Sequence, residues 1–519
     1  MGPLGSFADP FVARSRFTLK DDEAIGSHLS PIGDNLQIFC GMGETVTVKK
    51  GQTIELDITD VALGGRGLAK VEGMAVFVDG AVGGDRVLAR VVRRKKQYAE
   101  ARVLEVLRPS ADRVPAPCPY HGICGGCKWQ HLAYAAQLVY KRRHVAEALA
   151  HIGGLEGVAV HPVSPADPIF GYRNKMEFSC TDRRWVMPQD LDRPEVERGF
   201  ALGLHVPGTF DKVLDVAACR LMPALGNTLL AEIRRFLRQS LRPPYGLRSH
   251  EGFWRFVMLR HSLAQDRWLV NLITASEDPA AVQPLADALM AAHPRVAGVV
   301  NNITARPAAI AVGEIERCLA GVPVLTDRIG PWEFDISANS FFQTNTRGAE
   351  RLYGIVADYA GLDGSQTVLD LYSGIGTIPI FLSGAARRVV GVEIVPGAVA
   401  DARRNCAHNG VANCRFIEGD IRAVGAALPE RPDLVIVDPP RVGMHPAVVA
   451  RLLAMAPPRI VYVSCNPATL ARDLALLKEA YEVAEVQPVD MFPHTFHIEA
   501  VARLERRGRG ALAFSEIGS

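Results

Sequence analysis

The sequence predicts a multidomain protein: an N-terminal OB-like β-barrel, a central α+β domain carrying a cysteine loop, and a C-terminal α/β domain of the doubly wound, Rossmann-like type. A length of 519 residues exceeds what one hydrophobic core usually serves. Short alternating runs with glycine turns follow Glu44, and repeated strand, loop and helix patterns follow Trp332. We therefore expect an N-terminal extension at 1–44, the barrel at 45–108, the central domain at 109–330 and the α/β domain at 331–519.

The composition is that of an ordinary globular protein. Apolar residues make up 48% and charged residues 22%, and a formal charge of +2 means that a nucleic-acid partner must be argued from local patches. No apolar run is long enough to predict a membrane span, and Asp21, Asp22 and Glu23 interrupt the N-terminus where a signal peptide would be apolar. We expect a cytoplasmic protein without a membrane partner, in which the ten cysteines are metal ligands, nucleophiles or core residues.

The N-terminal extension shows no sustained periodicity. Its segment Gly2-Pro3-Leu4-Gly5-Ser6 resembles the remnant of a protease site in an expression tag, so we leave 1–44 out of the fold prediction.

The predicted barrel consists of short strands separated by glycine turns. Between Asp85 and Arg108, eight basic residues face three acidic ones. The run from Arg93 to Lys96, beside Tyr98, predicts either a phosphate-contacting patch with a stacking ring or a solvated hairpin tip. The segment "VALGGRGLAKVEGMAVFVDGAVGGDRVLARV" resembles the TRAM domain, an RNA-binding barrel. The expected strands are Thr45–Val48, Ile54–Ile58, Ala75–Val78, Asp85–Val92 and Ala101–Val106.

A cysteine loop follows the barrel. Cys118, Cys124 and Cys127 lie within ten residues between prolines and glycines, and Cys219 comes much later. Zinc ribbons usually have two paired knuckles, so three cysteines plus a remote one favour a [4Fe-4S] cluster over structural zinc or unmetallated thiols. Cys180 is an alternative fourth ligand. The spacing differs from the C-x3-C-x2-C of radical S-adenosylmethionine enzymes, so electron donation is not our first interpretation.

The central region mixes helical and strand patterns. Lys128 to Gly153 is an amphipathic helical stretch. The polar segment Tyr172-Arg173-Asn174-Lys175 is either a substrate contact or an ordinary strand edge. Further strands are expected at Phe200–His205, Trp268–Thr274 and Gly298–Thr304, and helices at Leu225–Arg238 and Ala280–Ala292.

The C-terminal domain places polar residues where predicted parallel strands end. Strand Thr367–Leu371 runs into the turn Tyr372-Ser373-Gly374-Ile375-Gly376, and strand Arg388–Val392 ends at Glu393. A carboxylate there can accept both ribose hydroxyls of a bound nucleoside, although dinucleotide enzymes share this geometry. Strand Arg415–Ile417 precedes Asp420, strand Leu434–Val437 ends at Asp438, and Glu482–Val489 and His497–Leu504 form a closing pair.

Two further residues are candidates for chemistry. Cys465 ends the buried strand that begins at Ile460, because Asn466-Pro467 stops that strand before a helix at Ala468 to Tyr481. A thiol at this sheet edge either touches a ligand or is a small buried hydrophobe. Glu499 lies in an apolar alternating run, where burial would raise its pKa and suit proton abstraction; the alternative is a surface strand residue.

Six ordered motifs in residues 332–505 carry a resemblance: "FFQTN", "DLYSGIGTIPI", "GVEIVPGAV", "VDPPR", "SCNPATLARDL" and "HIEAVARLER". With the barrel and the cysteine loop, the chain resembles the RNA uridine C5-methyltransferase family, closest to the branch acting on large-subunit (23S) ribosomal RNA. The resemblance implies that Cys465 is the nucleophile and Glu499 the base. It also implies an S-adenosyl-L-methionine site at Gln343, Tyr372, Gly374, Glu393 and Asp438, with Asp420 as an adenine contact.

The implied reaction accounts for the thiol. C5 of uracil is a weak nucleophile, so addition of the Cys465 thiolate at C6 would activate C5 toward the methyl group, and Glu499 would then remove the C5 proton. Cytosine C5-methyltransferases commonly use a second cysteine in a Pro-Cys motif, and enzymes that methylate exocyclic amines need no cysteine. Uridine is therefore preferred over both cytosine C5 and an exocyclic amine as the target. The expanded segment Thr181 to Arg198 departs from the family pattern and leaves the substrate open. Transfer RNA remains the alternative substrate. A radical enzyme and a non-catalytic RNA-binding protein remain the alternative functions. We expect the protein to be a monomer.

Overall fold

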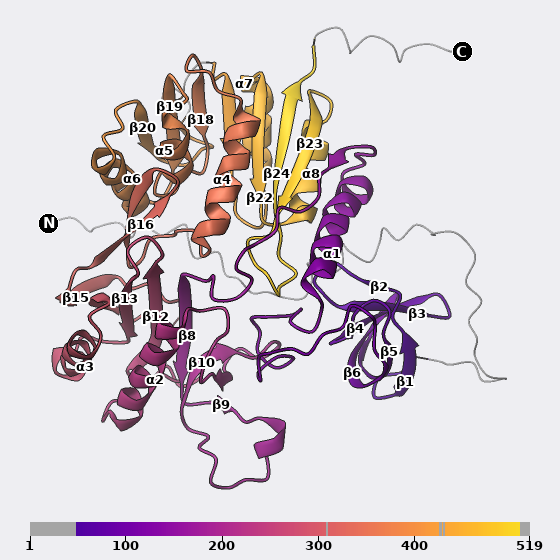
Figure 1. The fold of residues 1–519 in the computed structure, drawn as a ribbon, viewed down its shortest axis with the longest axis vertical. Coiled ribbons are helices and arrows are strands. Elements are labelled where there is room, and N and C mark those ends of the chain that lie inside the picture. Colours follow the sequence, from indigo (N-terminus) through magenta and orange to yellow (C-terminus); the bar gives the residue numbers. More distant parts are fainter. Residues whose placement is uncertain (1–47, 308–309, 425–427, 429–430, 509–519) are drawn as a thin grey trace, which may run out of the picture.

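The computed structural model describes residues 48–307, 310–424, 428 and 431–508 (Figure 1). The 1–44 extension with its tag-like segment, and all of the expected strand Thr45–Val48 except Val48, lie outside these residues. The described strands form a six-stranded sheet, two eight-stranded sheets and a two-stranded hairpin. Within the described ranges, every helix is too short or too polar to cross a membrane.

The six-stranded sheet forms the N-terminal barrel. Its strand order is β1-β5-β6-β4-β3-β2, and β1 continues almost directly into β2. β1 pairs with β5, whereas β2 pairs with β3 and Thr59 N donates to the carbonyl of Leu68 in β3. β1 and β2 therefore act as one bent strand that joins both ends of the sheet. This is the topology of a five-stranded OB barrel, as predicted. The strands are β1 (Thr53–Asp57), β2 (Asp60–Val61), β3 (Gly67–Val71), β4 (Met74–Asp79), β5 (Arg86–Arg94) and β6 (Tyr98–Arg108).

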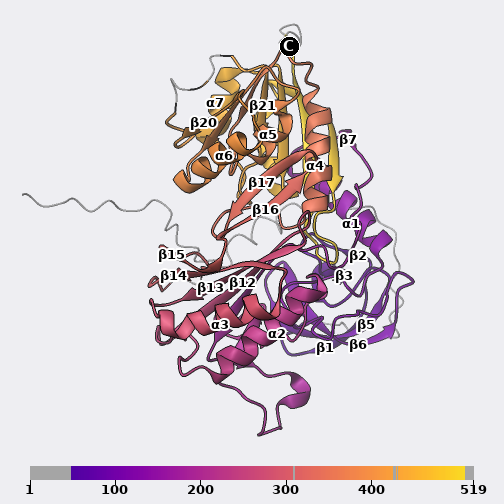
Figure 2. The ribbon, with the colours of Figure 1, turned by 60° about the vertical axis from the view of Figure 1, so that its left-hand side comes forward.

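The central sheet carries two helices on one face. Helices α2 (Ala224–Gln239) and α3 (Pro279–Ala292), both predicted, lie side by side below the sheet in Figure 2. They bury Leu229, Ile233 and Leu285 against the strands, which leaves the opposite face directed toward the C-terminal domain. The strands, in sheet order, are β15 (Ile315–Gly321), β14 (Val296–Ile303), β13 (Arg267–Thr274), β12 (Trp254–Ser262), β8 (Lys175–Thr181), β10 (Ala201–His205), β11 (Val213–Asp215) and β9 (Arg184–Trp185).

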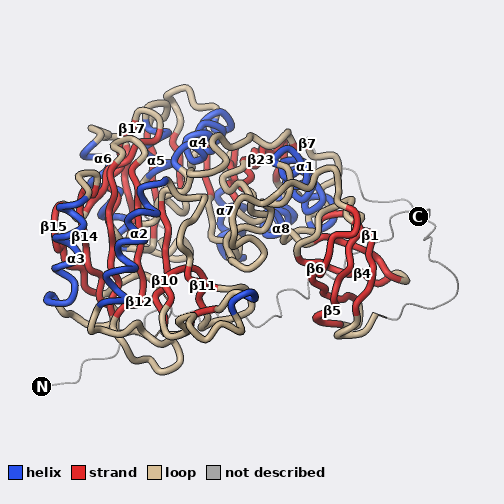
Figure 3. The backbone as a smooth tube through the Cα atoms, turned by 60° about the horizontal axis from the view of Figure 1, so that its bottom comes forward, coloured by secondary structure: helices blue, strands red, loops and turns tan. Residues whose placement is uncertain are grey.

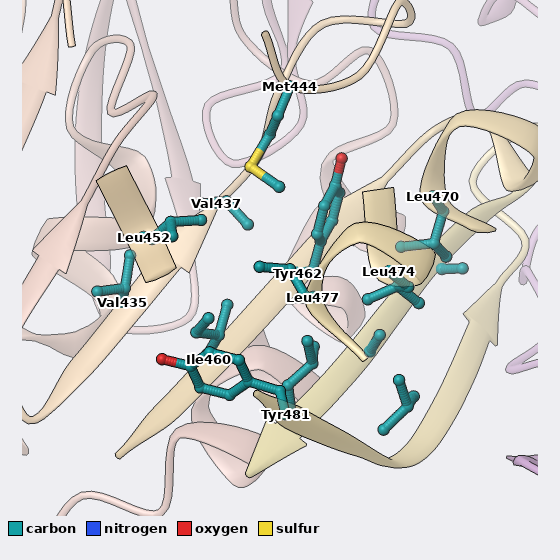
Figure 4. Close-up of a cluster of buried hydrophobic side chains, with 14 of the residues drawn as sticks. Val435, Val437, Met444, Leu452, Ile460, Tyr462, Leu470, Leu474, Leu477 and Tyr481 are labelled. Carbon is teal, nitrogen blue, oxygen red and sulfur yellow. The ribbon is translucent and has the colours of Figure 1, made fainter. Parts of the chain in front are cut away.

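The C-terminal sheet has the order β20-β19-β18-β21-β22-β24-β23-β7. Neighbours from β20 to β22 are parallel and β24 is antiparallel to both of its neighbours, which confirms the predicted parallel sheet and closing pair. The middles of its interior strands are apolar because helices cover both faces. Figure 4 shows one such layer, with Ile460, Tyr462 and Leu474. The bounds are β18 (Thr367–Asp370), β19 (Arg388–Glu393), β20 (Cys414–Glu418), β21 (Leu434–Val437), β22 (Arg459–Ser464), β23 (Tyr481–Val489) and β24 (Glu499–Arg506).

Helices and a hairpin complete this domain. The hairpin β16 (Val324–Ile329) and β17 (Trp332–Ser337) leads into α4, which begins after Asn345 because the Asn345 side chain accepts the N–H of Gly348. The helices of this domain are α4 (Thr346–Ala360), α5 (Thr377–Ser383), α6 (Pro396–His408), α7 (Pro446–Met455) and α8 (Pro467–Leu477).

One N-terminal segment belongs spatially to this sheet. Helix α1 (Tyr134–Glu147), continued by the π-helical turn Ala148–Ile152, packs beside the short strand β7 (Ala159–Val160), and β7 pairs with the edge of β23 (Figures 2 and 3). Arg142 joins the two, since its Nε and Nη2 donate to the carbonyl of Val160 at 3.0 and 2.7 Å. The domain boundaries at 108 and 330 stay a prediction, and residues 134–160 lie against the C-terminal sheet although they precede the central one.

Candidate active site

A cavity of about 1120 Å³ lies where the carboxyl ends of the C-terminal strands face the cysteine loop and the central sheet. It brings together most of the residues singled out in the sequence. Asp420 is not among its lining residues, and Nε of Arg422 instead donates to the Asp420 carboxylate at 2.8 Å. The predicted residues that line the cavity are Cys118, Cys124, Cys127, Cys219, Gln343, Tyr372, Gly374, Glu393, Asp438, Cys465 and Glu499.

The glycine turn after β18 fixes the carboxylate of Glu393. Gly374 N donates to one carboxylate oxygen of Glu393 at 3.0 Å, and Val395 N donates to the other at 2.8 Å. Gly376 has φ +84°, and a Cβ atom there would lie 2.9 Å from the ring of Phe416. The turn therefore requires glycine, and it holds Glu393 at the strand end beside the cavity.

Several buried carboxyl groups gather at this sheet edge. Burial raises the pKa of Asp438 to about 7 and that of Asp370, at the end of β18, to about 8. Burial and the nearby Asp438 raise the pKa of Glu499 well above its usual range. The Asp438 and Glu393 charges add to the shift of Asp370, so the edge favours a cationic ligand.

Cys465 occupies the predicted position between strand and helix. It follows β22, and the Asn466 side chain accepts the N–H of Ala468 at 3.1 Å to begin α8. Burial raises the pKa of the thiol to about 11, and the neighbouring Glu499 carboxyl adds to this shift. Formation of the thiolate near neutral pH therefore needs additional positive charge or a base in the site.

Arg441 supplies such a charge, and sequence reasoning gave it no role although it stands in the "DPPR" motif. It lines the cavity, and its positive charge opposes the raised pKa of both Cys465 and Glu499. Its carbonyl accepts hydrogen bonds from Asn466 Nδ2 at 3.1 Å and Thr469 Oγ1 at 3.3 Å, which join it to the start of α8. A cation next to a predicted strand-end carboxylate was the signal that could have identified it.

The Arg-Asn-Lys segment reaches the cavity from the central sheet. Arg173 and Lys175 line the cavity, and Lys175 begins β8 in the interior of the sheet rather than at its edge. Asn174 is buried, and its Nδ2 donates to Gln343 O and to Thr346 Oγ1, both at 2.9 Å. The segment therefore ties the central sheet to the predicted Gln343 position.

The cysteine loop lines part of the cavity. Gly126 N approaches Cys124 Sγ at 3.4 Å, and Cys118 N donates to the side chain of Gln130 at 3.2 Å. Burial raises the pKa of Cys124 to about 11 and that of Cys127 to about 12. Cys219 lies with them, whereas Cys180 is buried in the apolar core of the central domain.

No three described His, Cys, Asp or Glu side chains converge closely enough to hold a single metal ion. The predicted metal site is thus not shown by the structure, although its four cysteines all line the cavity.

The expanded segment 181–198 packs near these thiols. Trp185 ends β9, which pairs with β11. Together with Met187 it packs against an apolar cluster that Tyr120 and Ile123 also contact. Cys124 and Cys219 contact the same cluster. The side of the cysteine loop next to this segment is thereby covered by apolar side chains.

Comparison with known proteins identifies the family. A model described as tRNA (Uracil-5-)-methyltransferase matches residues 326–507, and a TRAM domain model matches residues 47–104. An uncharacterised RNA methyltransferase of Chlorobaculum tepidum is 43% identical over 474 residues, covering 89% of this chain and 98% of the relative. This chain belongs to the RNA uracil-5-methyltransferase family.

Other similarities agree with this assignment. An uncharacterised RNA methyltransferase of Porphyromonas gingivalis is 39% identical over 470 residues, covering 87% of this chain and 99% of that protein. The crystal structure of Pyrococcus abyssi tRNA (uracil-54, C5)-methyltransferase in complex with S-adenosyl-L-homocysteine has a TM-score of 0.69 at 28% identity, covering 87% of this chain and all of that one. The predicted enzyme class and TRAM domain are confirmed.

In this RNA methyltransferase the basic run of the TRAM domain lies at the turn between β5 and β6. Arg94, Lys95 and Lys96 are exposed there, and Arg93 forms an ion pair with Glu100. Tyr98 packs edge-on against Phe77, with ring centroids 5.7 Å apart. Both interpretations of this run, phosphate contact and solvated tip, are compatible with this geometry.

Proposed function

We propose that the protein transfers a methyl group from S-adenosyl-L-methionine to C5 of uridine in structured RNA, through a covalent adduct between Cys465 and C6. The observation that carries the proposal is the convergence of the Cys465 thiol, the Glu499 carboxyl and the Glu393 turn on one cavity. Large-subunit ribosomal RNA is the proposed substrate because the motifs resemble that branch. Transfer RNA is the second candidate, because the matching family model and the Pyrococcus abyssi enzyme are both named for it.

The residues of the glycine turn fit the cofactor. Glu393 would accept the ribose hydroxyls, and Gln343, Tyr372 and Gly374 would complete the binding wall. Asp438 and the neighbouring carboxyl groups suit the positive sulfonium, whose methyl group is the electrophile that S-adenosyl-L-methionine supplies when bound. Asp420 would have to release Arg422 to reach the adenine, so it is the least supported of these proposed contacts.

Cys465 and Glu499 divide the proposed chemistry. Addition of the Cys465 thiolate to C6 makes C5 a carbon nucleophile. C5 then forms the bond to the methyl group as the sulfur–methyl bond of the sulfonium breaks, and its electron pair stays on the sulfur of the departing S-adenosyl-L-homocysteine. Glu499 next accepts the C5 proton, and the electron pair of the C5–H bond restores the ring double bond as the thiolate leaves. The raised pKa of Glu499 makes its carboxylate a stronger base than an exposed one.

We also propose that Cys118, Cys124, Cys127 and Cys219 hold a [4Fe-4S] cluster. A zinc ion needs its thiolates about 2.3 Å from one centre, whereas the thiolates of a cluster are spread around four irons. All four thiols line the cavity, and Cys118, Cys124 and Cys219 lie near enough to Cys127 for their charges to raise its pKa. Three thiols from one loop and a fourth from a remote segment fit the cluster better. The bound cluster would tie the 118–127 loop to the segment between β11 and α2.

The function is tested with RNA from a strain that lacks this gene. Incubation with the purified protein and isotope-labelled S-adenosyl-L-methionine should place 5-methyluridine at a defined position, located by mass spectrometry in separated ribosomal and transfer RNA. RNA binding without methylation would indicate the non-catalytic alternative. Reductant-dependent release of 5′-deoxyadenosine would indicate the radical alternative.

Cofactor affinity should depend on pH through Asp438. Its pKa is raised to about 7, so the carboxyl group is neutral below that pH and anionic above it. Raising the pH from about 6 to about 8 should therefore tighten S-adenosyl-L-methionine binding by about three- to tenfold, while S-adenosyl-L-homocysteine, whose sulfur is neutral, should respond less. Calorimetric titration measures both, and Asp438→Asn should remove the difference. Equal pH dependence for both ligands would contradict the prediction.

RNA affinity should depend on the exposed turn of the TRAM domain. Replacing Arg94, Lys95 and Lys96 with alanine should weaken binding and flatten its salt dependence, by about 0.7 in the log–log slope for each lost contact to single-stranded phosphate. Filter binding from about 50 to 200 mM salt measures this. Alanine at the exposed Lys49 and Lys50, outside this turn, is the matched control. An unchanged slope in the triple variant would identify the run as a solvated tip.

A further inference from the structure

The loop at residues 490–498 forms one wall of the cavity. It joins β23 to β24, and its side chains Phe492, Thr495 and His497 line the cavity directly before Glu499, the first residue of β24. Any shift of this loop therefore changes the surface that faces the proposed nucleophile and base.

A buried ion pair fixes the start of this wall. Lys141 Nζ of α1 donates to Asp490 Oδ1 at 2.6 Å, and both side chains have no exposed surface. Lys141 Nζ also donates to Phe492 O at 3.1 Å, and Asp490 Oδ1 accepts Phe492 N at 3.0 Å. The two charged groups thus hold both polar atoms of the Phe492 backbone.

A second anchor from the same helix holds the middle of the wall. The buried Gln137 accepts His494 N through Oε1 at 2.9 Å, while its Nε2 donates to Trp129 O at 3.0 Å and Leu132 O at 2.8 Å. His494 O accepts the N–H groups of Lys128 and Trp129 at 3.0 and 2.9 Å. Since Lys128 directly follows Cys127, this network connects the cysteine loop to the wall.

The wall needs these anchors because its conformation is strained. His494 has φ +66°, in the left-handed region that costs energy for a residue other than glycine. Its ring is stacked on Phe170, with centroids 4.1 Å apart. The anchors on α1 are 349 and 357 residues away from their partners in the chain, so sequence-local structure cannot replace them.

We propose that Lys141 and Gln137 are positioning residues for methyl transfer: through Asp490 and His494 they hold the 490–498 wall in the geometry that the chemical steps require. The inference rests on the proposed function of Cys465 and Glu499. Neither residue lines the cavity, so both act through the loop.

The test compares Lys141→Met and Gln137→Leu with Arg142→Met on the same helix. Arg142 bonds to Val160 O and not to the loop, so its replacement weakens the packing of α1 without releasing the wall. For the first two variants, kcat and the rate of adduct formation with 5-fluorouridine RNA should fall by about ten- to a hundredfold, with KM for RNA within about threefold. Amide exchange at 491–498 should become faster. Arg142→Met should leave all of these within about threefold of the unchanged protein.

A double variant separates positioning from stability. Lys141→Met/Asp490→Leu leaves no unpaired buried charge, so it should recover the melting temperature lost in Lys141→Met. It still lacks both groups that hold the Phe492 backbone, so its rate should stay low and its loop exchange fast. Recovery of the rate together with the melting temperature would overturn the proposal, and so would full activity in Gln137→Leu.

The same experiment distinguishes the two levels of inference. If the unchanged protein forms no adduct with 5-fluorouridine RNA, the proposed function fails. If the unchanged protein and Lys141→Met form the adduct at equal rates, only the positioning role is overturned. Should Lys141→Met not fold, Gln137→Leu and the double variant provide the decision.

Discussion

Replacing Cys465 with alanine should abolish both methylation and the covalent adduct with RNA. The cavity presents this thiol beside Glu499 and Arg441, and without it C5 of uracil stays a weak nucleophile. S-adenosyl-L-methionine should still bind, because the Glu393 turn is unchanged. A denaturing gel with radiolabelled methyl donor measures the adduct, and calorimetry measures cofactor binding.

Cys318→Ala is the matched control, since Cys318 is exposed on β15 of the central sheet. It should keep full activity. Methylation by Cys465→Ala would show that another group is the nucleophile.

Glu499→Gln should act on the opposite side of methyl transfer. Attack by Cys465 and transfer of the methyl group should still occur, but removal of the C5 proton should slow by about a hundred- to ten-thousandfold. The labelled gel should then show methylated RNA attached to the protein, a band absent for Cys465→Ala. Turnover at the normal rate without a trapped species would assign the base to another residue.

Loss of Cys219 should remove the proposed cluster completely. Anaerobically purified protein should be brown with about four irons and four sulfides per chain, and Cys219→Ser should be colourless. Cys180→Ser should retain the iron, because Cys180 is buried in the apolar core and does not line the cavity. Iron and sulfide analysis with absorption spectroscopy measures both variants. Zinc without iron in the unchanged protein, or iron loss only in the Cys180 variant, would exclude this ligand set.

The C-terminal sheet, and the grouping of its candidate site residues, were largely predictable from local patterns. Runs such as Ile460–Val463 are apolar on every residue, which is typical of a parallel strand covered on both faces. Because parallel strands end at one edge, Glu393, Asp438 and Cys465 could be expected near one another. The structure places all three around one cavity.

Other features depended on contacts that no local pattern carries. Strand β3 contains Gly67 and Lys70 in place of a β-branched run, so it was missed. The packing of α1 and β7 on the C-terminal sheet joins segments more than three hundred residues apart. The Lys141–Asp490 pair was likewise invisible, because a lysine in an amphipathic helix ordinarily faces water.

The position of α1 and β7 has a consequence for synthesis of the chain. Lys141 leaves the ribosome 349 residues before Asp490, and β7 waits almost as long for the strand that it joins. At about 5–20 residues per second, this interval is on the order of 15–70 s. During that time Lys141 has no counter-ion, and the other side chains that α1 buries, among them Gln137, His144 and Val145, have no sheet to pack against until translation is nearly finished.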